Sequence, residues 1–236
     1  AFLPVHFSAG RHASPLTRLS ARDSTRARSQ YVNQRIKRCG KNWKCALREL
    51  RKFRAEPGGV DVFAYGAALA VCAQSGQWEK ASQLLDDMNT DDVPINTICY
   101  NAALSAYEKK ANWQKSLALL RTMQERKVAP DILTFNTAMS ACAKAGQWEA
   151  AVAILKSLRS GRFEGLKPDA VTFSTAISAL GKAGRTDEAL ALLDAMEQDG
   201  VRPNVYSFSA AISACGANWR RAVGVLSSMR VRGVRA

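Results

Sequence analysis

Apolar residues recur along the chain at spacings of three, four and seven, which place them on one stripe of an α-helix. Two kinds of stripe alternate. One begins with an aromatic residue, as in Phe135, Met139 and Cys142, and the other contains an aliphatic pair, as in Leu119 and Leu120. The pattern predicts amphipathic helices that follow one another in pairs, each pair forming a helical hairpin.

The hairpins repeat with a period of about 35 residues. Four tryptophans are spaced by 35 and open the second helix of their units: Trp43, Trp78, Trp113 and Trp148. The predicted units are 62–96, 97–131, 132–169, 170–204 and 205–236, with a degenerate unit at about 29–61. The unit 132–169 has 38 residues, the extra ones at 160–166, and the first and last units lack two residues at the inter-helix turn.

Glycine and proline mark the expected helix ends. Gly76, Gly146 and Gly184 stand where a left-handed C-cap would end a first helix. Three prolines are expected to stop the second helices and to stiffen the link to the next unit: Pro130, Pro168 and Pro203. A single hairpin cannot bury its own apolar faces, so neighbouring hairpins must stack into an all-α solenoid.

The helix-start segments 131–137 and 169–175 resemble the pentatricopeptide repeat, as do 140–146 and 182–189. The related tetratricopeptide repeat, which binds proteins, has 34 residues and an early tryptophan in its first helix. Here tryptophan opens the second helix, which favours P-type pentatricopeptide repeats. The resemblance implies a right-handed α-solenoid superhelix of stacked hairpins over 29–236, and a single-stranded RNA partner read at one base per repeat.

By this resemblance, the fifth and last residues of each unit select a base on its Watson–Crick edge. The fifth residues are Asn33, Gly66, Asn101, Asn136, Ser174 and Ser209, and the last residues are Asp61, Asn96, Asp131, Asp169 and Asn204. The implied core is 5′-U-N-U-U-A-3′. Asp and Asn also favour helix N-caps; Thr134, Thr172 and Ser207 are alternative caps that would leave the last residues free.

Two further columns of residues recur in the units. The second residues are bulky and apolar, and they wedge between bases, as in the family, pack the joint between units, or do both: Phe63, Ile98, Leu133, Val171 and Tyr206. Lysines recur at position 13, where they either contact phosphates or are simply solvated: Lys41, Lys109, Lys144 and Lys182. Phosphate contacts would make RNA affinity fall with rising salt.

The 236-residue chain carries a formal charge of +14, most of it near the ends. Residues 1–60 have 14 basic and 3 acidic side chains, a net of +11, whereas residues 61–200 have 14 and 17, a net of −3. Residues 1–28 form an Arg- and Ser-rich, acid-poor leader, typical of an organelle transit peptide and equally compatible with a solvated basic tail. We expect little fixed structure there and a chloroplast or mitochondrial location, the chloroplast being preferred.

Several classes of site are disfavoured. Six irregularly spaced cysteines and two histidines argue against a disulfide framework or a zinc module, and four of the cysteines fit buried helix positions: Cys39, Cys72, Cys142 and Cys215. The sequence has no P-loop, zinc deaminase signature or nuclease-like carboxylate cluster, so we expect no enzyme, cofactor, metal or small-molecule substrate. No apolar run is long enough for a membrane span.

The sequence therefore predicts a non-catalytic, sequence-preferring RNA-binding protein of organellar RNA metabolism. Its tasks would lie in RNA processing, stability, splicing, editing or translation, with other RNA-processing proteins as further partners. The alternative is an assembly scaffold that holds rRNA or protein, for instance in an organellar ribosome. An editing or ribonuclease enzyme would require a catalytic module beyond Ala236.

Overall fold

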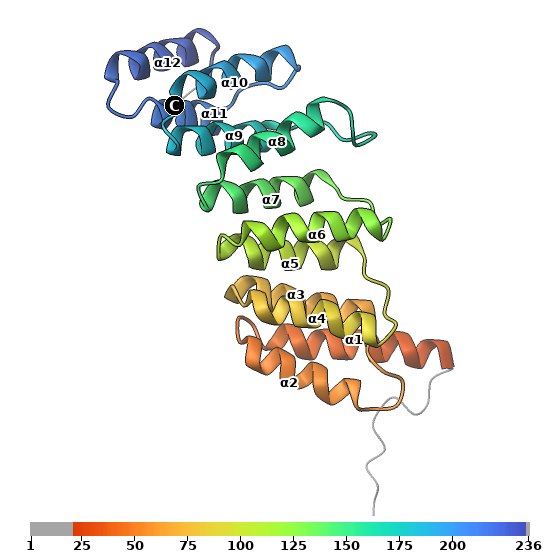
Figure 1. Ribbon diagram of the computed structural model, residues 1–236. Helices are drawn as coiled ribbons and strands as arrows, with labels where there is room; N and C mark the ends of the chain where they lie inside the picture. Colours follow the sequence, from red (N-terminus) through yellow and green to blue (C-terminus); the bar gives the residue numbers. More distant parts are fainter. Residues whose placement is uncertain (1–20, 235–236) are drawn as a thin grey trace, which may run out of the picture.

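The computed structural model of the protein describes residues 21–234, and every regular element in this part of the chain is an α-helix. The helices are α1 (Ala21–Arg38), α2 (Trp43–Arg54), α3 (Val62–Ser75), α4 (Trp78–Thr90), α5 (Thr97–Lys109), α6 (Trp113–Glu125), α7 (Ile132–Lys144), α8 (Trp148–Arg159), α9 (Ala170–Lys182), α10 (Thr186–Gln198), α11 (Val205–Ala214) and α12 (Trp219–Val231). They form hairpins stacked in chain order (Figure 1). The predicted all-α solenoid is confirmed.

The starts of the first helices α3, α5, α7, α9 and α11 coincide with the first residues of the predicted units. Tryptophan opens the second helices α2, α4, α6, α8 and α12. The boundaries follow from the sequence because each first helix is preceded by Asp or Asn, which caps it.

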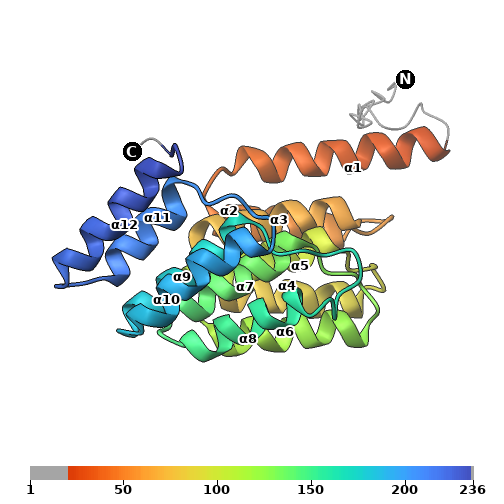
Figure 2. The same cartoon turned by 90° about the horizontal axis from the view of Figure 1, so that it is seen from above.

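The core lies mainly between consecutive first helices. Each first helix packs on the first helices of neighbouring units and on adjacent second helices, whereas the backbones of the second helices in the described residues come close only to first helices. The leading aromatic side chains are fully buried in this layer, among them Tyr65, Tyr100, Phe173 and Phe208. Figure 2 shows α3, α5 and α7 in one layer and α4, α6 and α8 in the other.

Left-handed residues end both kinds of helix. Gly76, Gly146 and Gly184 have φ of 64°, 74° and 73°, as predicted for C-caps of first helices. The prediction that proline stops the second helices is wrong. Helix α6 ends at Glu125; Lys127 is left-handed, with φ of 57°, and the Val128 N–H donates to the Met123 carbonyl at 2.9 Å. This Schellman-type ending precedes proline, which lies in the link.

The expectation of little structure over residues 1–28 is wrong for 21–28, which belong to α1. Arg28 holds this helix to the end of the first unit: its guanidinium donates to the carbonyls of Phe53, at 3.3 Å, and Pro57, and pairs with Glu56 at 3.6 Å. These contacts supply the tertiary stabilisation that the leader's composition does not reveal. Residues 1–20, and with them most of the leader, lie outside the described residues.

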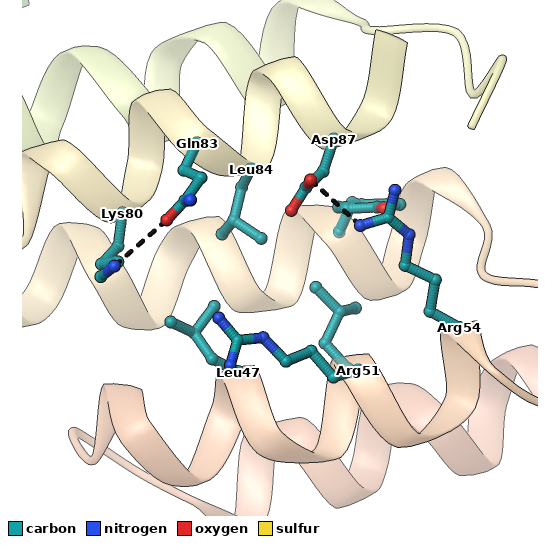
Figure 3. Close-up of a pocket in the computed structure, with 9 residues that line it drawn as sticks. Leu47, Arg51, Arg54, Lys80, Gln83, Leu84 and Asp87 are labelled. Carbon is teal, nitrogen blue, oxygen red and sulfur yellow. Dashed lines mark hydrogen bonds and ion pairs between the residues drawn. The ribbon is translucent and has the colours of Figure 1, made fainter. Parts of the chain in front are cut away.

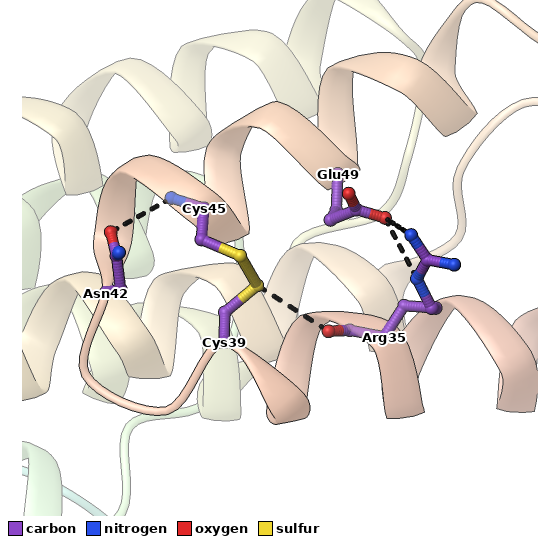
Figure 4. Close-up of a disulfide and its surroundings, with 5 residues drawn as sticks. All are labelled: Arg35, Cys39, Asn42, Cys45 and Glu49. Atoms are coloured by element: carbon purple, nitrogen blue, oxygen red, sulfur yellow. Dashed lines mark hydrogen bonds and ion pairs between the residues drawn. A yellow bond between two sulfur atoms is a disulfide. The ribbon is translucent and has the colours of Figure 1, made fainter.

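A disulfide links Cys39, at the end of α1, to Cys45 in α2 (Figure 4). The prediction that Cys39 is a buried apolar residue is therefore wrong, because it lies in a partly exposed turn beside a second cysteine. The predictions for Cys72, Cys142 and Cys215 are confirmed, since all three thiols are buried. Burial raises the pKa of Cys72 and of Cys142 to about 11, so both thiols are protonated at neutral pH.

The missing residues of the last unit are absent from its first helix, not from the inter-helix turn as predicted. Helix α11 has 10 residues where α9 has 13, and the turn 215–218 is longer than the turn 183–185. The first unit has a similar long turn at 39–42. Lys41 lies in that turn, off the helix, and so does not share the helical position of the other three lysines.

Ion pairs join neighbouring second helices. Arg54 at the end of α2 lies 3.0 Å from Asp87 in α4 (Figure 3). Arg54 also lies 2.6 Å from Asp91, which accepts from the Tyr65 hydroxyl at 2.6 Å. The hollow beside these residues has a volume of only about 20 Å³. Within residues 21–234, no helix is long and apolar enough to cross a membrane.

Candidate nucleic-acid interface

Two of the predicted fifth-and-last pairs lie in direct contact. Asn101 Nδ2 donates to Asp131, 3.1 Å from each carboxylate oxygen. Asn136 Nδ2 lies 3.1 and 3.3 Å from the carboxylate oxygens of Asp169. Residues about one repeat apart in the sequence meet here because each first helix begins beside the first turns of the preceding one.

The last residue of every unit caps the next first helix. The side-chain oxygens of Asp61, Asn96, Asp131, Asp169 and Asn204 accept a backbone N–H three residues later, at 2.7–3.0 Å. The alternative that the following Thr or Ser replaces this cap is wrong. The Thr134 hydroxyl instead accepts from the Asp131 N–H at 3.0 Å, completing a capping box. Capping uses Oδ1 of Asp131, and Asn101 Nδ2 lies at the same distance from Oδ1 and from Oδ2.

The threonines after the caps also reach into the preceding unit. Thr134 Oγ1 lies 2.7 Å from Asn101 Oδ1, and Thr172 Oγ1 lies 2.7 Å from Asn136 Oδ1. Both threonines are fully buried. The sequence pattern predicts these threonines only as possible caps and does not predict this contact between units. The available signal was the coincidence of a threonine at position three with an asparagine at position five of the preceding unit.

The two carboxylates are ionised at neutral pH. Burial by itself would raise the pKa of Asp131, but hydrogen bonds from Thr134 and Asn101 outweigh it, and the pKa lies below the ordinary aspartate value. The pKa of Asp169 is lowered against burial in the same way, by Thr172 and Asn136. Each pair therefore places a carboxylate acceptor beside an amide N–H donor, with Asn136 itself only 8% exposed.

The other predicted pairs are built differently. Asn33 does not bond Asp61, which accepts from the Ser29 hydroxyl instead, and Asn33 Oδ1 is buried without a partner. Gly66 offers no side chain to Asn96. The Ser174 hydroxyl donates to the Ala170 carbonyl of its own helix at 2.6 Å, not to Asn204. Ser209 is exposed on α11.

The bulky second residues form an exposed apolar row. Their exposed fractions are 65% for Phe63, 72% for Ile98, 57% for Leu133, 56% for Val171 and 78% for Tyr206. More than half of the surface of each residue is exposed, so none of them is sealed in the joint between units. Apolar side chains exposed at one recurrent position are typical of a binding surface.

A hollow of about 510 Å³ is lined by the predicted base-reading residues, the exposed apolar second residues and the lysines of position 13. Its lining includes the fifth residue Ser174, the last residue Asn204, and the second residues Val171 and Tyr206. Lys144 and Lys182 also line it. The volume is in the range of ordinary ligand sites. It lies along α7, α9 and α11, on the first-helix side of the solenoid.

The predicted lysine column is only partly available. Lys144 pairs with Glu108 at 2.8 Å, and Lys109 donates to the Gln74 carbonyl at 2.8 Å, at the end of α3. Lys109, Lys144 and Lys182 are the last residues of their helices, where a cation is also favoured by the helix dipole. In the described part of the chain, no group of three or more His, Cys, Asp or Glu side chains is placed to hold a metal ion.

Family models match most of the repeat region. The PPR repeat family matches residues 130–182 and 168–217, the pentatricopeptide repeat domain 83–145, and a single PPR repeat 63–93. The chain belongs to the pentatricopeptide repeat family. No curated protein matches it significantly.

Solved structures agree with this assignment. The protein is similar to PPR10 in complex with an 18-nt psaJ RNA element, with 26% identity and a TM-score of 0.69 over 85% of this chain. PPR10 from maize alone gives 24% identity and a TM-score of 0.67 over 94%. The chain spans 29% and 31% of the length of these PPR10 chains.

The fold is shared with an enzyme-associated repeat domain as well. The PPR domain of Arabidopsis thaliana protein-only RNase P 1, solved with tRNA, has 18% identity and a TM-score of 0.59. That match covers 71% of this chain and 88% of the domain.

Proposed function

We propose that this pentatricopeptide repeat protein is a sequence-preferring binder of single-stranded RNA that acts in organellar RNA metabolism without catalysis of its own. The observation that carries the proposal is the alignment of three columns on the first-helix side. Hydrogen-bonded Asn–Asp pairs, exposed apolar residues and helix-end lysines lie on consecutive first helices. A flexible single strand can place its bases and phosphates on such a surface.

The Asn–Asp pairs supply the chemistry of base choice. An N–H donor beside a carboxylate acceptor complements a carbonyl oxygen beside a ring N–H, which is the Watson–Crick edge of uracil. Cytosine carries the two kinds of group in the opposite order, an amino donor at position 4 and an acceptor at ring N3, so it mismatches a pair whose amide faces position 4 and whose carboxylate faces N3. The units 97–131 and 132–169 therefore account for the central U-U of the proposed 5′-U-N-U-U-A-3′ core.

The remaining positions of the core are expected to contribute less. Gly66 leaves its unit without a fifth side chain, which agrees with N at the second position. The first U depends on Asn33 and Asp61, which are not bonded to each other. The final A depends on Ser174 and Asn204, which line the 510 Å³ hollow.

Titration of labelled oligonucleotides tests the proposal. An RNA that contains U-N-U-U-A should bind more tightly than a scrambled RNA, and replacing the two central U by C should weaken binding more than replacing the first U. Changing N is the matched control and should have no effect. Equal affinity for core and scrambled RNA would refute sequence-preferring binding and leave the scaffold function.

The salt dependence tests the lysine column separately. The variant Lys109→Ala/Lys144→Ala/Lys182→Ala should weaken binding to all RNA sequences. Each phosphate contact on a single strand contributes roughly 0.7 to the slope of log affinity against log salt, so the slope should fall by at most about two. An unchanged slope would show that these lysines do not contact phosphate.

The organellar location is supported by the Arg- and Ser-rich, acid-poor composition of residues 1–28. Fusing residues 1–40 to a fluorescent protein should direct it to chloroplasts or mitochondria. Replacing the arginines of residues 1–28 by glutamate is the control, and it should abolish import. Diffuse fluorescence of the unmodified fusion would contradict the proposal.

A further inference from the structure

The buried threonines at position three differ from ordinary capping residues in having two neighbours from different units. Thr172 Oγ1 lies 2.8 Å from Oδ1 of Asp169, which caps its own helix, and 2.7 Å from Oδ1 of Asn136 in the preceding unit. It also accepts the Asp169 N–H at 3.1 Å. Thr134 has the same three contacts, to Asp131 and Asn101.

The first unit shows what happens when this hydroxyl is absent. Ala64 occupies the position of Thr134 and Thr172, and the fifth residue of the preceding unit is Asn33. Within residues 21–234, Asn33 Oδ1 is buried without a hydrogen-bond partner. Asp61 accepts from the Ser29 hydroxyl and the Ala64 N–H, not from the Asn33 amide. Where threonine is present, the asparagine amide is bonded at both ends; where alanine replaces it, the amide oxygen is left without a partner.

The last unit gives a second comparison. Ser207 occupies the same position and completes the capping box of α11, with its hydroxyl 2.8 Å from the Asn204 N and 2.8 Å from the Asn204 carbonyl oxygen. The fifth residue of the preceding unit is Ser174, whose hydroxyl bonds its own helix. The capping role is therefore separable from contact with the fifth residue.

We propose that Thr134 and Thr172 are positioning residues for base selection, which fix the amide orientation of Asn101 and Asn136. The inference rests on the proposed RNA-binding function. With Oδ1 held by the hydroxyl, Nδ2 must face the carboxylate and keeps its second hydrogen for a base. In the flipped amide, Oδ1 would face the carboxylate and two acceptors would repel each other.

Loss of the hydroxyl should therefore change selectivity more than affinity. A rotated amide can present Oδ1 toward the base and accept from the cytosine amino group. A hydrogen bond of this kind contributes modestly to an equilibrium, so the preference for U over C at the affected base should fall by roughly 3- to 10-fold.

The test compares Thr172→Val, which removes the hydroxyl at similar volume, with Thr172→Ser, which retains it. RNAs with U or C at the base assigned to unit 132–169 are titrated against each protein, with the U of unit 97–131 unchanged. Thr172→Val should lose the preference for U over C only at the base assigned to unit 132–169, and Thr172→Ser should keep this preference. Ser207→Ala is the matched control, since it removes a capping hydroxyl that touches no fifth residue.

The outcomes separate this inference from the proposed function. If the unmodified protein prefers U over C and Thr172→Val keeps the full preference, the positioning role is overturned while RNA reading stands. If the unmodified protein shows no preference, the proposed function itself fails. If Thr172→Val and Ser207→Ala lower the melting temperature alike and only the former alters base preference, the positioning role is supported independently of capping.

Discussion

Asn136 Nδ2 lies 3.1 Å from Oδ1 of Asp169, the same oxygen that accepts the Thr172 N–H at 2.8 Å and so caps α9. The Asp169 carboxylate thus caps α9 and also holds the side chain of Asn136, which is proposed to read a base. Stability and recognition are joined at this residue, and suitable substitutions separate them.

Replacing Asp169 by Asn and by Ala should give different results. Asn caps a helix about as well as Asp but lacks the charge whose hydrogen bonds lower the pKa of Asp169. Asp169→Asn should therefore lower the free energy of unfolding at neutral pH by less than Asp169→Ala, which should lower it by about 0.5–2 kcal/mol. Both should lose the preference for U, because the ionised acceptor is gone and the one side-chain oxygen left in Asp169→Asn is used to cap α9. Denaturant unfolding and RNA titration measure the two effects; retained U preference in Asp169→Asn would contradict the reading role.

The exposed apolar row should contribute to RNA affinity without contributing to stability. Leu133→Ala and Val171→Ala remove side chains that are 57% and 56% exposed, so melting temperatures should change little. Contact with a base is worth about 1–3 kcal/mol, and affinity should fall accordingly. Val231→Ala, on α12 and 88% exposed, is the matched control. Equal affinity of Leu133→Ala, Val171→Ala and the unmodified protein would exclude base contact.

The lowered pKa values of Asp131 and Asp169 predict an acid-sensitive contribution to stability. Because both folded-state pKa values are lowered, the contribution is fully present above the unfolded value of about 3.9 and is lost as pH falls through the folded-state values. Protonation of Asp131 and Asp169 should therefore not lower the melting temperature between pH values of about 5 and about 7. Below a pH of about 4, the double variant Asp131→Asn/Asp169→Asn should lose less stability than the unmodified protein. Parallel acid profiles would rule out these carboxylates as the source.

Gly181 should tolerate no side chain. A Cβ at this position on α9 would lie 2.6 Å from Ala214 Cβ and 2.8 Å from Ala214 Cα, at the end of the short helix α11. Gly181→Ala should therefore cost about 1–3 kcal/mol of unfolding free energy. Gly224→Ala on α12 is the control: nothing lies within 4 Å of its Cβ, and it should stabilise the helix by about 0.5–1 kcal/mol. Equal effects of the two substitutions would mean that α9 and α11 are not in close contact.

The sequence alone determined the hairpin period, the unit boundaries and the face that carries the candidate site. These properties are local: an apolar stripe, a capping Asp or Asn and a left-handed glycine each act within a few residues. The second residues Phe63 and Tyr206 follow from the same pattern, because a bulky residue outside the buried stripe must face solvent or a ligand.

Only the tertiary structure decided which polar groups meet between units. The contacts of Thr172 with Asn136, Lys144 with Glu108 and Arg28 with Phe53 join residues 25 to 36 positions apart. Such contacts depend on how far one hairpin is shifted and rotated on the next, and the apolar period leaves this shift open. The period places each hairpin in the stack. The packing between hairpins decides whether Asn33, Asn101 and Asn136 can each form a hydrogen bond with the last residue of the same unit.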